Sequence, residues 1–582
     1  MVLRKYFSTG VPGSTGLVNM TTLWLAFLGA ALAAREKKLL ALATGDLLPK
    51  GWLRDMTHIV SSALSAAICS GLALASYELV MEERRFETMY IDWLPAWIVQ
   101  SIMPITLAVI ALRLVFGAGQ DWKTRFPAAI GLPAGFLLAR ALIASADAAD
   151  GPLFWEASVW PGLVTVLIAA VLGAPIFVVI AGIAGVLFVT SGDTLLAIPS
   201  DAFGMAVKPH LASIPLFTLT GFLLAEGDVP ARLLRLFRGF FGWMPGGTAV
   251  VCAALCAFLT VFTGGSGVTI LVLGGILFQA LKEDGYREQF SLGLLTASGS
   301  LGLLLPPALP LILYGVVAGV PIEKLFVGGI LPGLLLVGLI AAWGVREGLI
   351  GNSKRQPFNF KEARSALWAA KYEVSIPIIV LASIFSGWAT LVESAAVTAL
   401  AAFVIQVFIH KNIKLRTDLR RVVRECVVLT GGVLIILAMA YSLTGYLTLE
   451  GVPGQMIAWM QERVESKWVF LLCVNIFLLL VGCMMDIFSA TVVVVPLLVP
   501  LGQAYGIDPV HLGIIFIANL ELGYLTPPVG LNLFLASYRF KRPLLTVYRA
   551  ALPMLVILAI GVVAITYIPW LTTALLGYFE LD

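Results

Sequence analysis

Charged residues are scarce in this chain: only 12% of its residues are Asp, Glu, Lys or Arg, while 59% are hydrophobic. Soluble domains carry about a quarter charged residues, so the composition excludes an ordinary soluble protein and predicts an all-α, multi-pass membrane protein. At about 20 apolar residues per span, the chain has room for roughly a dozen helices or more. The formal net charge of +4 decides little, because orientation in a bilayer depends on where Lys and Arg lie.

Several patterns that carry chemistry are also missing. The six cysteines have no CxxC spacing and no nearby His, and the four histidines lie far apart, so we expect no redox centre, disulfide framework or metal cluster. There is no GxxxxGK[ST] motif, so the chain should not hydrolyse ATP itself. The apolar stretches contain no Ser/His, paired-Asp or His-Glu constellation, so we expect no enzyme. Residues 1–19 lack the apolar core of a cleavable signal peptide.

The first part of the chain contains four apolar stretches. They predict helical spans at about 21–34, 56–80, 94–116 and 127–146. The basic segments 35–38 and 113–125 should then face the cytoplasm, and residues 145–156 the outside.

The character of the sequence changes near residue 157, where the spans become denser and Gly and Pro enter them. We therefore predict three parts. They are a small helical domain at 1–120, a connecting transmembrane helix within 121–156, and a large transport domain at 157–582.

Two apolar segments of the large domain are interrupted by Pro and Gly in the same way: SLGLLLPPALPLILYG at 300–315 and ELGYLTPPVGLNL at 521–533. Landmarks in and before them recur at one constant offset in the numbering (527 − 306 = 221). The matched landmarks are Pro306-Pro307 with Pro527-Pro528, Gly302 with Gly523, and Gly285 with Gly506. The common offset favours a duplicated unit, whereas two unrelated proline kinks would not share a register.

Each interrupted segment should unwind in the middle of the membrane, because proline removes a backbone donor and glycine loosens a helix. Unwound carbonyls can coordinate a cation, and half-helix N-termini favour an anion. A pair of such segments in two corresponding halves is typical of a transporter's binding site.

A shorter polar interruption precedes each break, at 258–275 and 478–500. Short apolar arms around a polar tip predict re-entrant hairpins, which enter and leave on the same side of the membrane. Asp486 lies at the second tip. A lone carboxylate inside the membrane usually has a function, although Asp486 could also lie in an interfacial loop.

The region from about 157 to 575 resembles the large membrane subunit of TRAP transporters, the tripartite ATP-independent periplasmic systems. The matching motifs occur in order and include LASIPLFTLTGFLLAEGDVPARLLRLFRGFFGWMPGGTAV, FTGGSGVTI, SLGLLLPPALPLILYG, LFVGGILPGLLL, GCMMDIFSATVVVVPLLVPLGQAYGIDPVHLGII and LGYLTPPVGLNLF. Residues 19–116 look like the small membrane subunit, so the chain resembles a fusion of the two.

This resemblance implies an elevator-type carrier with inverted repeats, two re-entrant hairpins and two unwound helices, in a bacterial or archaeal cytoplasmic membrane. It implies sodium (Na+) as the co-transported ion, an organic acid as substrate, and delivery by a periplasmic substrate-binding protein. It implies neither an ATPase subunit nor a nucleic-acid partner.

The resemblance also implies site residues. One sodium site would use Thr263, Gly264, Ser266, Ser298 and Gly302. The other would use Ser489, Gly523 and Thr526. The substrate would meet Ser266, Ser298, Asp486 and Asn532. Hydroxyl and carbonyl oxygens suit an alkali cation, although they do not distinguish sodium from protons.

The sequence departs from the family pattern in three places. Gly265 and Ala308 replace serines that are frequent in the family, which makes sialic acid a weaker expectation as substrate. The first span of the small subunit is missing, so we expect the true start to lie upstream.

Several roles stay open at this point. Glu521 could be a half-buried pairing partner or a cytoplasmic-face charge. We favour a helix cap or structural role for Glu393 over substrate contact. Arg232, Arg235 and Arg238 predict an amphipathic interfacial helix. The main alternative function is a stand-alone ion-coupled symporter of the dicarboxylate or citrate type, which needs no binding protein.

Overall fold

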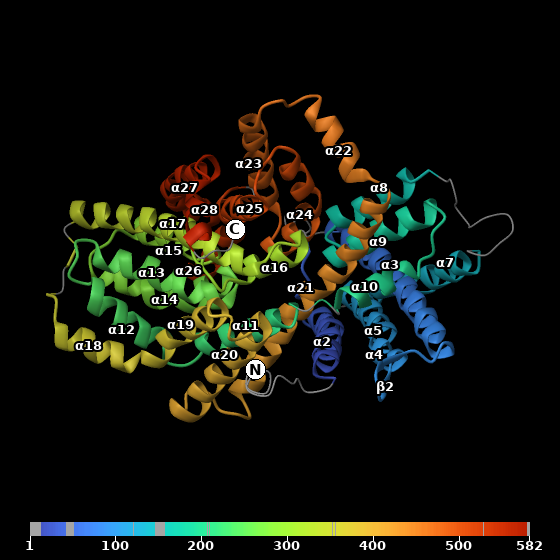
Figure 1. Cartoon of the computed structure of the whole chain (residues 1–582), viewed down its shortest axis with the longest axis horizontal. Helices are drawn as coiled ribbons and strands as arrows, with labels where there is room; N and C mark the ends of the chain where they lie inside the picture. The colour runs from blue at the N-terminus through green and yellow to red at the C-terminus, as the bar shows by residue number, and fades with distance from the viewer. Residues whose placement is uncertain are drawn as a thin grey trace. The chain divides into compact units, whose positions relative to one another are not determined.

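The computed structural model in Figure 1 consists almost entirely of helices. It describes residues 13–41, 52–119, 121–145, 158–206, 208, 210–351, 353–354, 357–527 and 529–578. Within these ranges the only sheet is an antiparallel pair, β1 (Met89–Ile91) and β2 (Leu94–Pro95). Eleven helical stretches of the described chain are long and apolar enough to cross a membrane, which confirms the all-α, multi-pass prediction.

The chain divides into two compact units. The repeat unit comprises residues 213–423 and 457–582, and the N-terminal unit comprises residues 2–212 and 424–456. The N-terminal unit thus takes in three whole helices and most of a fourth from beyond residue 157. The boundaries predicted at 120 and 156 rest on the change in span density and in Gly and Pro content along the sequence, and they stay a prediction.

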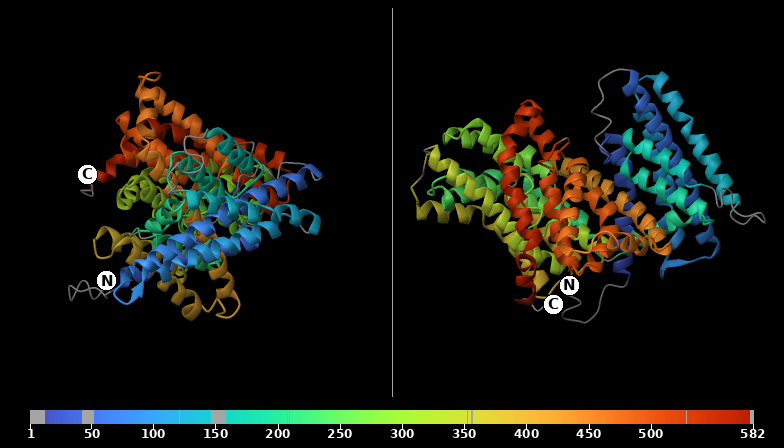
Figure 2. Two further views of the ribbon diagram at one scale, coloured as in Figure 1. Left: turned by 90° about the vertical axis from the view of Figure 1, so that its right-hand side faces the viewer. Right: turned by 90° about the horizontal axis from the view of Figure 1, so that it is seen from above.

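The N-terminal unit contains the four predicted spans as helices. Its elements are α2 (Ser14–Glu36), α3 (Trp52–Arg85), α4 (Ala96–Gln100), α5 (Ile102–Gly117), α6 (Trp122–Ala129), α7 (Gly131–Ser145), α8 (Trp160–Val171), α9 (Ile176–Thr190), α10 (Ala197–Ala206), most of α21 (Asp418–Leu449) and the start of α22 (Val452–Gln461). In Figure 2, α3, α5 and α7 form the blue and cyan bundle in which α3 packs against both of the others.

Small residues allow the predicted connecting helix to approach its neighbour closely. A Cβ on Gly131 or Gly135 of α7 would lie 2.1 or 1.9 Å from the carbonyl oxygens of Ala63 and Ala67 in α3. Membrane helices gain their packing energy from such close backbone contact, because lipid is as apolar as their own side chains. The two glycines therefore fix where α7 meets α3.

The repeat unit holds the remaining helices. They are α11 (Ser213–Ala225), α12 (Val229–Phe241), α13 (Gly247–Thr263), α14 (Ser266–Glu283), α15 (Glu288–Ser298), α16 (Leu309–Ala318), α17 (Ile322–Ile350), α18 (Phe360–Ala369), α19 (Lys371–Phe385), α20 (Leu391–Val404), the π-helical turn η2 (Ile405–Ile409), α23 (Lys467–Met484), α24 (Ile487–Ala504), α25 (Pro509–Gly523), α26 (Leu531–Phe540), α27 (Leu544–Tyr567) and α28 (Trp570–Tyr578).

The element bounds of this unit bear out the duplication. The offset found in the sequence recurs in the helix bounds. It separates the end of α13 from that of α23 (484 − 263 = 221) and both ends of α14 from those of α24 (487 − 266 = 221, 504 − 283 = 221). It also separates the start of α15 from that of α25 (509 − 288 = 221). The starts of α16 and α26 differ by one more (531 − 309 = 222). The same helix–tip–helix–break–helix series is therefore built twice.

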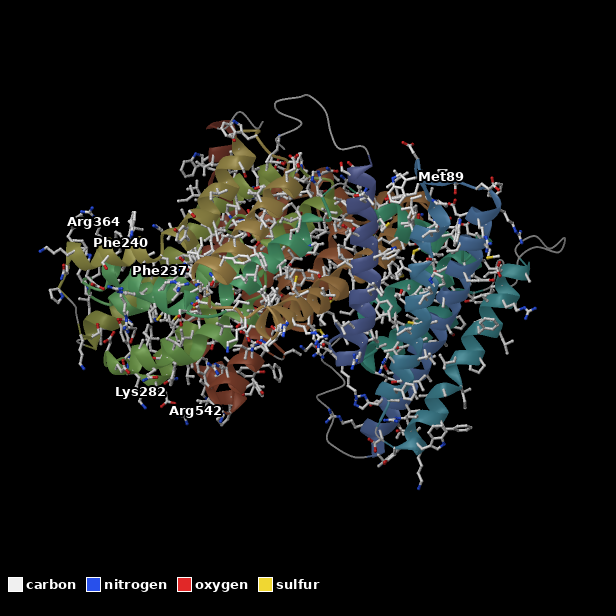
Figure 3. All side chains as sticks on the ribbon, turned by 90° about the horizontal axis from the view of Figure 1, so that it is seen from below. Met89, Phe237, Phe240, Lys282, Arg364 and Arg542 are labelled. Carbon is white, nitrogen blue, oxygen red and sulfur yellow. The ribbon has the colours of Figure 1, made fainter. Side chains whose placement is uncertain are left out.

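The amphipathic helix predicted around three arginines is α12. Arg232 donates to Oε1 of the buried Glu373 on α19 from Nε at 3.0 Å and Nη2 at 2.7 Å, and Arg235 pairs with Glu362 on α18 at 2.7 Å. His410 Nε2 lies 3.4 Å from the same Glu373 oxygen, and burial together with the charge of Arg232 lowers the pKa of His410. In Figure 3, Phe237 and Phe240 of α12 lie beside Arg364 of α18 at one end of the unit.

Candidate functional site: two broken helices and their hairpin tips

The first break lies between the end of α15 and the start of α16. Residues 299–308 form a series of tight turns, in which the N–H groups of Leu303 and Leu305 donate to the carbonyls three residues earlier, at 3.0 and 3.2 Å. Pro306 and Pro307 have no N–H to continue a helix here. The predicted unwinding of this segment is confirmed.

The preceding hairpin packs against this break through one hydroxyl and one glycine. Thr260 Oγ1 of α13 lies 2.7 Å from Thr269 Oγ1 of α14 and 2.9 Å from the carbonyl oxygen of Gly299, so it joins both arms to the break. A Cβ on Gly302 would lie only 2.2 Å from the carbonyl oxygen of Ala257. Glycine is therefore required where the break crosses α13.

The first hairpin tip is a short turn. Gly264 ends α13 with a left-handed φ of 63°, and α14 begins two residues later at Ser266. Thr263 Oγ1 donates to the Gly265 carbonyl at 3.4 Å, so its hydroxyl is directed at the tip itself. The Ser266 carbonyl oxygen lies 3.4 Å from the point that a Cβ on Gly299 would occupy, which places the start of α14 against the break.

Three polar oxygens around the first break have no protein partner. Ser266 Oγ, Ser298 Oγ and Asn532 Oδ1 are buried and form no hydrogen bond within the described residues. Asn532 belongs to α26 of the second repeat, yet its Nδ2 donates to the Thr296 carbonyl at 3.2 Å and to Ser300 Oγ at 3.3 Å. Predicted residues of both repeats therefore gather beside residues 296–300.

The second break lies between α25 and α26. The N–H groups of Leu525 and Thr526 each donate to a carbonyl three residues earlier at 3.0 Å, and the helix does not continue; Pro528 lies outside the described residues. A Cβ on Gly523 would lie 2.6 Å from the Cα of Gly482 in α23. Gly482 corresponds to Val261 in the first repeat (482 − 261 = 221). The backbone nitrogen of Val261 would lie 2.8 Å from a Cβ on Gly302. The glycine of each break therefore packs against the same matched position of its repeat.

At the second tip, Asp486 caps α24. Its Oδ1 accepts from the N–H groups of Phe488 and Ser489 at 3.0 and 3.1 Å, and its Oδ2 accepts from Ser489 Oγ. Tyr524 of the break accepts from the Ile487 N–H at 2.6 Å, which ties the break to the tip. The Thr526 hydroxyl donates to the Leu522 carbonyl at 3.1 Å, so the second predicted sodium site has its hydroxyls engaged.

Three of the four hairpin arms, α14, α23 and α24, are each 18 residues long and pass the length and hydropathy test for a membrane span. The expectation that both hairpins are re-entrant therefore stays a prediction. So do the inverted orientation of the repeats and the elevator mechanism.

Glu521 fits neither of the interpretations left open by the sequence. Its side chain is 1% exposed, and neither carboxyl oxygen has a hydrogen-bond partner in the described part of the chain, so it is neither half-buried nor paired. Glu393 does cap a helix, because its carboxylate and the Thr390 hydroxyl form a reciprocal capping box at the start of α20. No group of three or more His, Cys, Asp or Glu in the described residues could hold a metal ion.

Sequence reasoning missed Thr260, Ser300 and Tyr524, which hold the tips and breaks together. Ser300 had a usable signal: the repeat offset relates it to Glu521 (521 − 300 = 221), so it occupies the same place in the first repeat. Thr260 and Tyr524 have no comparable signal, because only the fold shows which atoms their hydroxyls reach.

Known protein families show which family a chain with this pair of broken helices belongs to. The family model described as "Tripartite ATP-independent periplasmic transporter, DctM component" matches residues 163–571. The chain belongs to this family. The model for the DctQ component of the same transporters matches residues 1–124. The chain is therefore a multi-pass TRAP transporter permease that joins both membrane components in one polypeptide, and it is a transporter component rather than an enzyme.

Three curated relatives show how far the similarity extends. The isethionate TRAP transporter permease protein DctMQ of Oleidesulfovibrio alaskensis is 29% identical over 94% of this chain and 86% of that protein. The C4-dicarboxylate TRAP transporter large permease protein DctM of Pseudomonas aeruginosa is 34% identical over 68% of this chain and 93% of its own length. The sialic acid TRAP transporter large permease protein SiaM of Vibrio cholerae is 31% identical over 63% of this chain and 87% of its own length. Permeases of this family work with a periplasmic substrate-binding protein.

Proposed function

We propose that this permease imports an organic acid handed over by a periplasmic substrate-binding protein, and that sodium entering with the acid drives the transport. The observation that carries the proposal is a set of three buried oxygens that have no partner in the described residues. They belong to Ser266 at the first tip, Ser298 at the start of the first break, and Asn532, whose amide donates to residues 296 and 300. Buried polar atoms are normally hydrogen-bonded, so such a group of neutral oxygens is suited to bind an alkali cation or the polar head of a substrate.

An acidic substrate is supported by the relatives and by the residues at the first tip and break. The three named relatives act on isethionate, C4-dicarboxylates and sialic acid, all of which are organic acids. Two hydroxyls frequent in the family are absent, because Gly265 and the fully buried Ala308 replace them. We therefore propose a small carboxylate or sulfonate rather than a polyhydroxylated sugar acid.

Uphill uptake of an anion needs positive charge to enter with it. Sodium would meet Thr263, Gly264, Ser266, Ser298 and Gly302 at the first break, and Ser489, Gly523 and Thr526 at the second. The substrate would meet Ser266, Ser298, Asp486 and Asn532. Both breaks and both tips belong to one compact unit, as an elevator-type movement of the whole site would require.

Uptake into proteoliposomes tests the proposal. The purified full chain would be supplied with a panel of labelled organic acids, with and without the binding protein encoded beside it, under an inward gradient of sodium or of potassium. We expect uptake only when the binding protein and sodium are both present. Uptake by the chain alone would favour the stand-alone symporter. Equal uptake under a potassium gradient would show that transport is not coupled to sodium.

A further inference from the structure

The carboxyl group of Glu521 has no role in the sites proposed above. It lies in the last turn of α25, two residues before that helix ends. The side chain is 1% exposed, and neither carboxyl oxygen has a hydrogen-bond partner among the described residues. A buried carboxylate without a partner is strongly destabilising, so its charge has to be compensated by a cation or removed by a proton.

The position of Glu521 at a helix C-terminus favours the cation. The last carbonyls of α25 give this end a partial negative charge, which attracts positive charge. A Cβ on Gly530 would lie 2.6 Å from Leu533 Cδ1, 2.9 Å from the Thr526 carbonyl oxygen and 3.0 Å from the Tyr524 carbonyl oxygen. Gly530, with its φ of 45°, permits this close packing just beyond the helix end.

The described residues supply no positive charge to this carboxyl group. No described Lys or Arg forms an ion pair or hydrogen bond with Glu521. Glu521 and Asp486 both interact electrostatically with Tyr524, which carries no positive charge. Lys467 and Tyr314, on helices packed against α25, donate instead to the carbonyls of Gly506 and Pro509 at the other end of the helix.

The matched position of the first repeat shows that this carboxyl group is not a requirement of the fold. Ser300 occupies that position, and its hydroxyl accepts from Asn532 Nδ2 at 3.3 Å and donates to the Ala297 carbonyl at 3.4 Å. A neutral, hydrogen-bonded side chain therefore serves the same backbone plan. Glu521 adds a carboxyl group without a hydrogen-bond partner in the described residues, at the second break only.

We propose that Glu521 supplies the negative charge of a monovalent-cation site at the second break. Carboxylate and carbonyl oxygens are the hard ligands that sodium prefers. The bound cation would neutralise the buried carboxylate and the helix end at once. The inference rests on the proposed sodium coupling, and it adds to the second site a negative charge that the neutral hydroxyls of Ser489 and Thr526 do not carry.

Binding of radioactive sodium to the full chain in lipid nanodiscs, without substrate, tests this assignment. The Glu521→Gln variant keeps the shape of the side chain and should weaken one class of sodium sites at least about tenfold, because an outer-shell partner alone is worth that much. Glu521→Asp keeps the charge and should bind with intermediate affinity, which covers the case in which the Gln variant does not fold.

Two controls separate this inference from the proposed function. Glu393→Gln removes a carboxylate engaged in a helix cap and should leave sodium binding unchanged. Ser266→Ala should weaken only the other class of sites, at the first break. If Ser266→Ala weakens binding but Glu521→Gln does not, the inference about Glu521 is wrong and sodium coupling stands; if the wild-type chain binds no sodium, both are wrong. An infrared band of a protonated carboxyl group at saturating sodium, lost in Glu521→Gln, would show a proton in place of the cation.

Discussion

At the first break, the hydroxyls of Ser266 and Ser298 have no partner in the part of the chain that the structure describes. At the second break, the hydroxyls of Ser489 and Thr526 each donate to a protein oxygen. The second break has an unpaired carboxyl group, that of Glu521, where the first has a hydrogen-bonded serine. The backbone plan is nevertheless the same in both, down to the glycine that packs against the preceding helix. Duplication has preserved the helix ends and close contacts, while the polar atoms available to ligands have diverged.

The largest effect should come from the glycines that the two breaks share. Gly302→Ala would place a methyl group 2.2 Å from a backbone oxygen, and Gly523→Ala would place one 2.6 Å from backbone carbon. Such overpacking costs about 1–3 kcal/mol of stability or more, and here no flexible side chain can move away. We expect both variants to lose uptake and to melt earlier in detergent, Gly302→Ala the more severely.

Gly338→Ala on α17 is the matched control, because a Cβ there would meet nothing within 4 Å. A Gly302→Ala variant that melted and transported like Gly338→Ala would contradict the shared backbone plan.

The next effect concerns Asp486, which has no carboxylate counterpart at the first tip, where Gly265 stands at the matched position. Asp486→Asn keeps an oxygen for the N–H groups of Phe488 and Ser489 but removes the charge and the acceptor for the Ser489 hydroxyl. We expect uptake to fall at least about tenfold, because a hydrogen bond from the substrate to a charged group contributes about 1.5–3 kcal/mol. Thermal stability should change little, since Asn caps a helix about as well as Asp. Parallel uptake and melting measurements check this, and a large drop in melting temperature would instead indicate a structural cap.

A sharper test compares hydroxyls with and without partners. Ser266→Ala and Ser298→Ala remove no protein hydrogen bond, so they should leave the melting temperature unchanged while raising the sodium concentration for half-maximal uptake about tenfold. Thr260→Val, one turn before the first tip, removes a bridging hydroxyl and should lower stability by about 1–3 kcal/mol. Equal melting losses in all three variants would show that the serine hydroxyls are structural.

The smallest expected effect is that of Asn532, which links the two repeats. Asn532→Ala removes donors to the Thr296 carbonyl and Ser300 Oγ, leaving those buried acceptors short of a hydrogen bond at a cost of about 1–3 kcal/mol. We expect uptake to fall a few-fold, with sodium and substrate affinities weakened together. Loss of affinity for only one of the two ligands would show that the breaks act separately.

Much of the repeat unit could be predicted from the sequence, because three landmarks at one offset give the register of the two breaks and the duplicated order of the helices around them. Gly523 and Gly302 could be read as essential, since a glycine kept at matched positions of two repeats marks a close backbone approach. The use of individual oxygens could not be predicted. Ser266 and Ser489 are both serines near a tip, but only the fold shows that Ser489 donates to Asp486 and that Ser266 has no partner. The contact of Asn532 with residues of the other repeat could not be predicted either, because the periodicity of a sequence describes one element at a time.

Sodium-dependent uptake by the Ser266→Ala/Ser298→Ala double variant, compared with the wild type, tests most directly whether the first break binds sodium. Both would be measured in proteoliposomes with the binding protein and a saturating labelled acid, with sodium varied at constant ionic strength. We expect uptake by the wild type to rise steeply with sodium concentration. The double variant should need at least about tenfold more sodium for half-maximal uptake, with an unchanged melting temperature. Identical sodium curves for the two proteins would contradict sodium binding at the first break.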